Sequence, residues 1–276
     1  MKRARRIRRV FFGVALVLAA LYAFPFVMVI MNSVKVRREV ANDPLAWPKS
    51  FEWSNFSRAI EKMEFWRALG NSFIVTILSV GSIIIASSLL AYYLSRSKSK
   101  FSTLTFLVLV ASMVVPFQAL MIPFVGLFGQ NGLDMPLNKF TIAFFYVGFG
   151  VAMSTFLYHG FISNIPVSLD EAAAIDGASS FKTFRKVIFP LLGPVTATVA
   201  IINSLWVWND FLLPSIVLVD NDQKTVPLRT FVFYGKYTSD YGLAMAGLLL
   251  SIVPIVIFYF VMQRRIIAGI SAGAVK

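Results

Sequence analysis

Six runs of apolar residues, separated by polar segments, dominate the pattern along this chain of 276 residues. Each run is close to the length of about 20 residues with which an α-helix crosses the hydrocarbon core of a bilayer. The runs cover residues 11–31, 71–94, 101–122, 140–162, 194–215 and 242–262. This pattern predicts an all-α polytopic membrane protein with six transmembrane helices. Because no repeat at a solenoid period is present, we expect a single transmembrane domain over residues 1–276.

The composition points to the same class of protein. Hydrophobic residues make up 58% of the chain and charged residues only 14%, so there is more apolar surface than one globular core can hide. The formal net charge of +13 is typical of nucleic-acid binding or of contact with an anionic membrane face. No basic face with interleaved aromatic residues appears, so we expect contact with membrane lipid and no nucleic acid. The absence of cysteine excludes disulfides, thiolate nucleophiles and thiolate metal sites.

The amino terminus sets the expected orientation. Its basic residues are Lys2, Arg3, Arg5, Arg6, Arg8 and Arg9. A cleaved signal peptide also begins this way, but the run 11–31 is too long for a signal core and no small-residue cleavage site stands out before Asn32, which favours a retained signal anchor. With this start in the cytoplasm, the inside segments carry more than half of the 26 Lys and Arg. We therefore expect both termini and the loop 163–193 to be cytoplasmic.

One polar stretch, residues 168–190, interrupts the apolar pattern. Ser168 and Glu171 match the S-x-x-E capping box and predict a helix that begins at Ser168. Gly177 is the residue best able to adopt the left-handed conformation that closes such a helix. The stretch therefore predicts a short helix followed by a glycine turn.

A second short helix is expected after this turn. Ser179 or Ser180 can cap it, and Pro190 and Pro194 are expected to end it before the fifth run. Its apolar residues recur at spacings of three and four and form one stripe: Phe181, Phe184 and Ile188.

Two interpretations of this helix, turn and helix unit compete. In the first it is an amphipathic connector on the lipid headgroups, with Lys182, Arg185 and Lys186 contacting anionic lipid. In the second it resembles the EAA loop of ATP-binding cassette (ABC) importer permeases. The matching positions are Glu171, Ala172, Ala173, Gly177 and Pro190. Val187 and Phe189 depart mildly from the Ile and Leu that are usual in the family.

The resemblance extends to "WVWNDFLLP", residues 206–214, and to the tail "MQRRIIAGISAGAVK", which are similar to carbohydrate permeases of the maltose type. It implies a type I ABC importer permease fold in a bacterial or archaeal cell (inner) membrane. It also implies four kinds of partner: a second permease subunit, two ABC ATPase subunits, an external solute-binding protein and a carbohydrate. ATP and Mg would be bound by the partner ATPase.

The same resemblance gives the loop a coupling role. Glu171, Ala172, Ala173, Gly177 and Pro190 fall on the family motif that contacts the ATPase. Small residues would permit close seating against the ATPase, and Phe181 and Phe184 would anchor the unit to its own bundle. Glu171 would pair with a basic residue of the ATPase, or serve only as a cap; both roles stay open.

The fifth apolar run carries candidate substrate contacts, because polar side chains inside a membrane span are costly. They recur at spacings of three and four and are Asn203, Trp206, Asn209 and Asp210. Trp and amide side chains stack on sugars and hydrogen-bond to them. In the alternative, Asn203 bonds a neighbouring helix and Asp210 lies near the outer interface. Gln118, in a proline-rich region that favours a broken helix, is a weaker candidate.

Other chemistry is not expected. No phosphate-cradling glycine loop is present, so we predict no ATP site and no cofactor in this chain. The lone His159 and the scattered carboxylates do not suggest a metal site or a catalytic constellation, which disfavours an intramembrane enzyme. The leading hypothesis is a transporter subunit for carbohydrate; a polyol or glycerol phosphate permease is an alternative. An ATP-independent secondary transporter would need more intramembrane charges.

Overall fold

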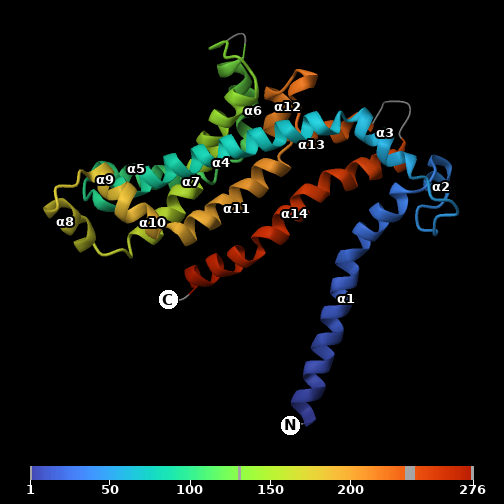
Figure 1. Cartoon of the computed structure of the whole chain (residues 1–276), viewed down its shortest axis with the longest axis horizontal. Helices are drawn as coiled ribbons and strands as arrows, with labels where there is room; N and C mark the ends of the chain where they lie inside the picture. The colour runs from blue at the N-terminus through green and yellow to red at the C-terminus, as the bar shows by residue number, and fades with distance from the viewer. Residues whose placement is uncertain (1, 130–131, 234–239, 275–276) are drawn as a thin grey trace. The chain divides into compact units, whose positions relative to one another are not determined.

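The computed structural model describes residues 2–129, 132–233 and 240–274, and the regular elements in these ranges are all helices (Figure 1). Within the described residues, four helices are long and apolar enough to cross a membrane. They are α1 (Lys2–Ser33), α4 (Phe65–Arg96), α7 (Lys139–Ile162) and α14 (Tyr241–Ala274). The prediction of an all-α polytopic membrane protein is confirmed.

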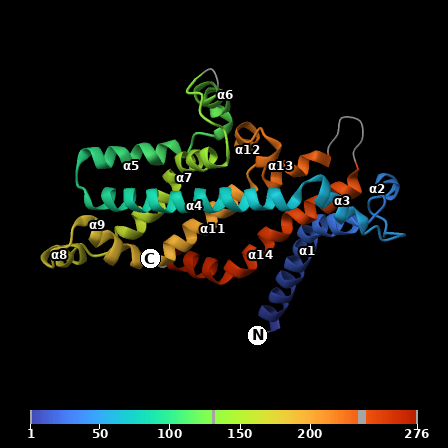
Figure 2. The same cartoon turned by 45° about the horizontal axis from the view of Figure 1, so that its top comes forward.

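Two further candidate spans are bent pairs of helices. α5 (Lys100–Ser112) and α6 (Phe117–Phe128) meet at 106°, and Figure 2 shows α6 turned away from α5. The run 101–122 is therefore not one straight helix. Pro116 has no N–H to donate and disfavours the helical conformation of the residue before it, so the helix stops and restarts there. The second pair is the segment Ser180–Leu191 with α11 (Gly193–Asn209), bent by 79°. The described chain has six candidate spans if each pair counts as one.

The shorter elements lie between these spans. Four belong to the segment 163–193: α8 (Ser168–Ile175), α9 (Ser180–Thr183), the π-helix η1 (Phe184–Ile188) and α10 (Phe189–Leu191). The others are α2 (Arg37–Asn42), α3 (Ser54–Lys62), α12 (Leu212–Val217), η2 (Asn221–Gln223), α13 (Val226–Thr230) and η3 (Phe231–Phe233).

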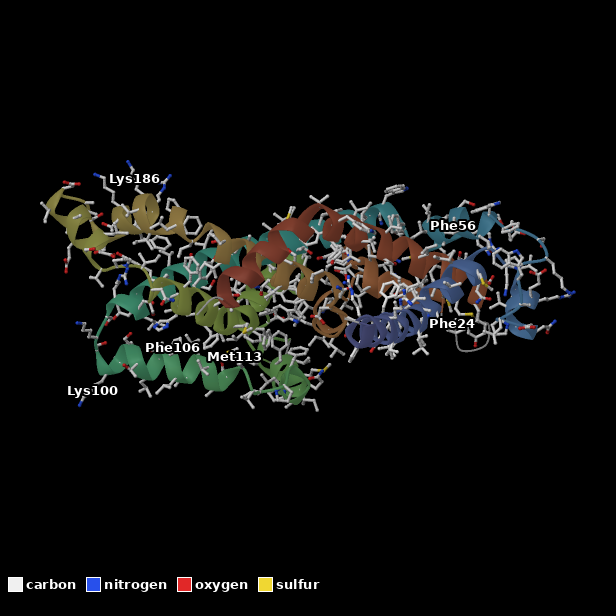
Figure 3. All side chains as sticks on the ribbon, turned by 90° about the horizontal axis from the view of Figure 1, so that it is seen from below. Phe24, Phe56, Lys100, Phe106, Met113 and Lys186 are labelled. Carbon is white, nitrogen blue, oxygen red and sulfur yellow. The ribbon has the colours of Figure 1, made fainter. Side chains whose placement is uncertain are left out.

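The chain forms two compact units. The first comprises Met1–Trp66 with Arg229–Pro254, and the second comprises Arg67–Leu228 with Ile255–Lys276. In the second unit, α7 packs against α5 and α11. A Cβ atom on Gly150 of α7 would lie only 2.7 Å from Cδ1 of Ile83 in α4, so a side chain there would push these helices apart. Phe106, labelled in Figure 3, joins α5 to α7 by stacking on His159 with 4.2 Å between ring centroids.

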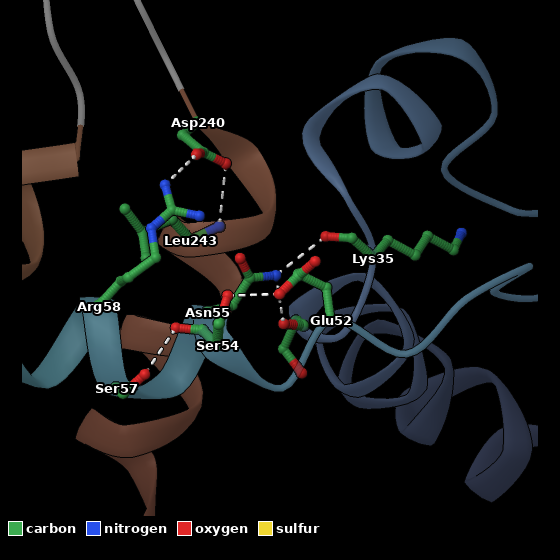
Figure 4. A network of polar contacts seen from close by, with 9 residues as sticks. Lys35, Glu52, Ser54, Asn55, Ser57, Arg58, Asp240 and Leu243 are labelled. Carbon is green, nitrogen blue, oxygen red and sulfur yellow. Dashed lines mark hydrogen bonds and ion pairs between the residues drawn. The ribbon is translucent and has the colours of Figure 1, made fainter.

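In the first unit, polar contacts hold the start of α14 (Figure 4). The Asn55 side-chain amide of α3 donates to the Lys35 carbonyl at 2.9 Å. Arg58 pairs with Asp240 at 3.3 Å, and Asp240 accepts from the Leu243 N–H at the start of α14. A Cβ atom on Gly242 would lie 2.7 Å from the same Lys35 carbonyl oxygen, so only glycine permits this approach.

Candidate functional site

The loop 163–193 has the helix, glycine turn and helix order that its sequence predicts. α8 ends in a Schellman motif, in which the Ala178 N–H bonds the Ala173 carbonyl at 2.9 Å and the Gly177 N–H bonds the Ala174 carbonyl at 3.0 Å. Gly177 lies in the left-handed region at φ +76°, as expected. Ser179 then caps α9, because its hydroxyl oxygen accepts from the Lys182 N–H.

α8 begins at Ser168 as expected, but the expected capping box is wrong. Val167 is the N-cap residue and Ser168 is already the first helical residue, with no side-chain capping bond. The reason is local: the Glu171 N–H bonds the Val167 carbonyl at 3.1 Å and the Leu169 N–H bonds the Pro166 carbonyl at 3.3 Å, so the backbone turns before Ser168. Glu171 is exposed, and neither it nor Ser168 forms a capping box.

α8 is the least covered helix of this loop. None of its residues is buried within the chain. Glu171 and Ala172 are exposed, Ala173 is half-buried, and the Ile175 side chain at the end of α8 is 87% exposed. A small-residue face next to an exposed apolar side chain is the kind of surface that another protein covers.

The two phenylalanines of the second helix differ. Phe184 is buried, packs its ring on Tyr92 at 5.3 Å between centroids, and lies in a core cluster with Tyr158 and Ile188. Phe181, in contrast, is 62% exposed, so the expectation that it anchors the loop to the bundle is wrong. α9 is only four residues long, and Phe181 lies in the turn before the chain enters the core.

Pro190 does not end the second helix as expected. The chain stays helical through Leu191, and α11 begins at Gly193. The π-helix before Pro190 has wider turns, in which the Phe189 N–H bonds the Phe184 carbonyl five residues earlier. Such a turn accommodates a residue that has no N–H of its own, and the sharp bend follows after Leu191.

A polar contact that the sequence analysis missed fixes α8 to the bundle. Asp170 of α8 accepts from the Tyr92 hydroxyl at 2.6 Å and from Arg96 Nε at 3.1 Å. A second guanidinium nitrogen of Arg96 lies 2.9 Å from the same Asp170 oxygen, and both side chains are 15% exposed. Arg96 also donates to the carbonyl of Ile162, the last residue of α7, and to that of Ile165 beyond it.

We call this set, Tyr92, Arg96 and Asp170, the α8 clamp. Asp170 is more than seventy residues from the other two members in sequence. The only sequence signal was an arginine at the end of one apolar run and an aspartate next to Glu171. Neither position in the sequence predicts that these two side chains contact each other.

A cavity of about 540 Å³ opens in the second unit among α5, α6, α7, α11 and α12. Its lining is mostly apolar, with a few polar side chains, which is typical of small-molecule sites. The lining residues are Ser112, Met113, Val115, Phe117, Gln118, Leu120, Gly148, Phe149, Ala152, Trp206, Asp210, Leu212 and Leu213.

Two of the four polar candidates of the fifth run line this cavity. The Trp206 side chain is 40% exposed and meets the buried Tyr146 ring edge-on, at 5.3 Å and 85°. Asp210 accepts from the Tyr146 hydroxyl at 2.9 Å and from the Leu212 N–H at 3.0 Å. Gln118, the weaker candidate, also lies on the cavity wall.

The other two lie elsewhere. Asn203 is buried and donates to Ser154 Oγ on α7 at 3.0 Å, which is the helix-packing role. Asn209 is exposed and donates to the Leu205 carbonyl of its own helix at 2.7 Å. Asp210 is not part of a helical stripe with the other three, because α11 ends at Asn209 and the backbone of Asp210 is extended, at φ −69° and ψ 135°.

No group of three or more His, Cys, Asp or Glu side chains that could hold a metal ion occurs in the described part of the chain. The two sites are therefore a cavity within a helical membrane bundle and a bare helix clamped to the end of that bundle. A cavity between the helices of a membrane bundle is a place where membrane transport proteins bind small molecules.

Comparison with known proteins agrees. Residues 83–271 match the model of the binding-protein-dependent transport system inner membrane component family. The probable starch degradation products transport system permease protein AmyC of Thermoanaerobacterium thermosulfurigenes is 41% identical over 261 residues, which are 95% of this chain and 94% of that protein. The multiple sugar-binding transport system permease protein MsmG of Streptococcus mutans is 36% identical over 263 residues, 93% of this chain and 92% of that protein.

A solved structure shares the fold. It is the crystal structure of a bacterial ABC transporter involved in the import of the acidic polysaccharide alginate, with a TM-score of 0.81 and 22% sequence identity over 95% of this chain and 97% of that chain. The chain belongs to the family of binding-protein-dependent transport system inner membrane components. It is a multi-pass permease subunit of the inner membrane and not an enzyme.

Proposed function

We propose that this chain forms half of the translocation path of an ATP-driven carbohydrate importer. The names of the relatives, for starch degradation products and for multiple sugars, support carbohydrate as the substrate. A second permease subunit completes the path and two ATPase subunits bind ATP and Mg. An external solute-binding protein delivers the sugar. Both termini and the loop 163–193 face the cytoplasm in this proposal.

The observation that carries the proposal is the contrast between the two sides of α8. On one side, Asp170 is held by Arg96 and Tyr92 of α4. On the other side, Glu171 and Ala172 are exposed and nothing in the helix is buried. α8 is exposed on one face and fixed to the bundle by the other. When a partner protein bound to the exposed face moves, α8 transmits that movement to the bundle. The bare face is the seat for the ATPase, with Ala172, Ala173 and Gly177 allowing close approach.

The cavity is the proposed solute site of this half. Trp206 supplies a flat aromatic surface, and Asp210 and Gln118 supply hydrogen-bonding groups on its wall. Asn203 and Asn209 do not line this cavity, and their amides donate to Ser154 Oγ and to the Leu205 carbonyl.

The ATPase seat is tested by Ala172→Asp in the assembled complex. The change adds a charge at an exposed position of α8, where a substitution usually changes the free energy of unfolding by no more than about 0.5 kcal/mol. We expect the chain to insert normally, while ATPase copurification and substrate-stimulated ATP hydrolysis fall severalfold. The measurement is the ratio of ATPase to permease on the purified complex.

Ala41→Asp is the matched control, because Ala41 is also an exposed alanine of a short helix but lies in the first unit. It should leave ATPase copurification unchanged. Normal ATPase binding and stimulated hydrolysis in Ala172→Asp would mean that α8 is not the seat.

A further inference from the structure

The described residues that line the cavity beside Trp206 carry only negative charge. Among the described residues that line it, Asp210 is the only charged side chain, and none is Lys, Arg or His. The remaining polar side chains on its wall are Ser112, Gln118 and the indole of Trp206. A ligand inside this half of the path therefore meets a carboxylate with no neighbouring cation to balance a second negative charge.

Asp210 is held in place at this wall. One carboxylate oxygen accepts from the Tyr146 hydroxyl at 2.9 Å and the other from the Leu212 N–H at 3.0 Å. Tyr146 is fully buried, so its hydroxyl proton is committed to Asp210. Backbone groups at Phe211 and Leu213 also hydrogen-bond this carboxylate, so it is held in one orientation by the protein. What it presents to a ligand is chiefly its negative charge.

Tyr146 also supports the second contact surface. Its ring meets Trp206 at 85°, and Trp206 keeps 40% of its surface exposed. One buried tyrosine thus orients both an acceptor and a flat apolar face. A sugar ring presents hydroxyl donors at its edge and C–H groups on its faces, which matches this pair.

We propose that this cavity selects uncharged saccharides and that Asp210 rejects saccharides bearing a carboxylate, sulfate or phosphate. The inference rests on the proposed function and narrows its substrate class. The physical reason is that two like charges in a mostly apolar cavity repel more strongly than in water. The fold by itself does not determine the charge of the substrate, because a solved ABC transporter of this fold is involved in the import of the acidic polysaccharide alginate. In this proposal, the charge of Asp210 on the cavity wall determines it.

The test uses the cysteine-free chain within its full complex. Ser112→Cys places a thiol on the cavity wall at a position that is exposed. Labelling of this thiol by a water-soluble reagent is measured against increasing ligand. The probes are a neutral malto-oligosaccharide and the same oligosaccharide oxidised to a uronic acid at one end. The concentration that halves the labelling rate reports occupancy of the cavity without dependence on the external binding protein.

We expect the neutral ligand to protect the thiol at a concentration at least about tenfold lower than the acidic ligand, a difference of about 1.4 kcal/mol. Asp210→Asn should reduce this ratio to near one by improving binding of the acidic ligand. Tyr146→Phe keeps the charge but frees Asp210, so it should weaken protection by the neutral ligand and retain the preference.

Asp134→Asn is the control. Asp134 is an exposed aspartate outside the cavity, and asparagine tolerates the positive φ of this position.

The outcomes distinguish a failure of the charge selection from a failure of the saccharide site itself. Equal protection by both ligands in the parent protein, or an unchanged ratio in Asp210→Asn, overturns the charge selection and leaves a saccharide site. Absence of protection by either ligand overturns the saccharide site itself. If Asp210→Asn does not assemble, Tyr146→Phe still decides, since loss of the preference in a variant that keeps the carboxylate contradicts the proposal.

Discussion

At the scale of single residues, Gly177 shows how one backbone angle limits the choice of side chain. It lies at φ +76°, and a Cβ atom built on it meets no atom of the chain within 4 Å. The restriction within this chain is therefore conformational and not steric crowding. A β-branched residue in this conformation is strained by about 1–3 kcal/mol, whereas asparagine adopts it at lower cost.

We predict that Gly177→Val inserts normally but loses most sugar uptake and most stimulation of ATP hydrolysis by loaded binding protein. Gly177→Asn should keep most of both. Uptake and hydrolysis are measured on the same membrane preparation, with the amount of inserted chain as the control. If Gly177→Asn fails as badly as Gly177→Val, the open space at Gly177 is filled by the docked ATPase, and the requirement is for size and not for backbone angle.

At the scale of secondary-structure elements, the α8 clamp joins α8 to α4 and, in the proposed function, carries the movement of α8 to α4. Arg96 donates to Asp170 and to the carbonyls of Ile162 and Ile165, which lysine cannot reproduce with one ammonium group. Removing one partner of a buried ion pair costs about 3–5 kcal/mol, because the other charge is left buried. The clamp should therefore matter more than an ordinary surface pair.

We predict a graded loss of coupling, largest for Asp170→Asn, which leaves the Arg96 charge unpaired, smaller for Arg96→Lys, which keeps the charge, and smallest for Tyr92→Phe. The readout is the number of sugar molecules taken up per ATP hydrolysed, which should fall while hydrolysis continues. Arg58→Ala is the matched control, since it breaks an ion pair with Asp240 in which Arg58 is 53% exposed, a pair worth at most about 1 kcal/mol. A ratio that stays constant across the three clamp variants would show that α8 acts on the bundle by another contact.

At the scale of the whole molecule, the proposed orientation places alternate loops on opposite sides of the membrane. The chain has no cysteine, so a single introduced thiol reports its own side. We predict that Asp134→Cys and Asp222→Cys react with an impermeant thiol reagent applied outside intact cells. Ser97→Cys and Ala172→Cys should react only after the membrane is opened.

These four positions are polar or exposed loop and helix sites, so burial does not limit labelling. Complete labelling of all four after permeabilisation is the control for access. External labelling of Ala172→Cys would reverse the proposed orientation and would remove α8 from the side on which ATP is hydrolysed.

The sequence by itself determined the class of protein, the helical character of the spans and the turn at Gly177. These depend on local properties: runs of apolar residues long enough for a bilayer, and the conformational freedom of glycine. Ser179 as a cap and Phe184 as a buried residue follow from the same local rules. The capping box expected of Ser168 and Glu171 does not form, because the sequence does not show whether Pro166 and Val167 have already turned.

Only the tertiary structure decided which polar side chains act together. Trp206 and Asn203 share a helix and a spacing of three, yet one lines the cavity and the other bonds Ser154 of α7. The clamp joins Arg96 to Asp170 across two helices, and Tyr146 joins Trp206 to Asp210 from a third. Spacing along a chain gives the face of one ideal helix, but it does not give the breaks in that helix or the neighbours it meets. Those depend on packing between segments that are distant in sequence.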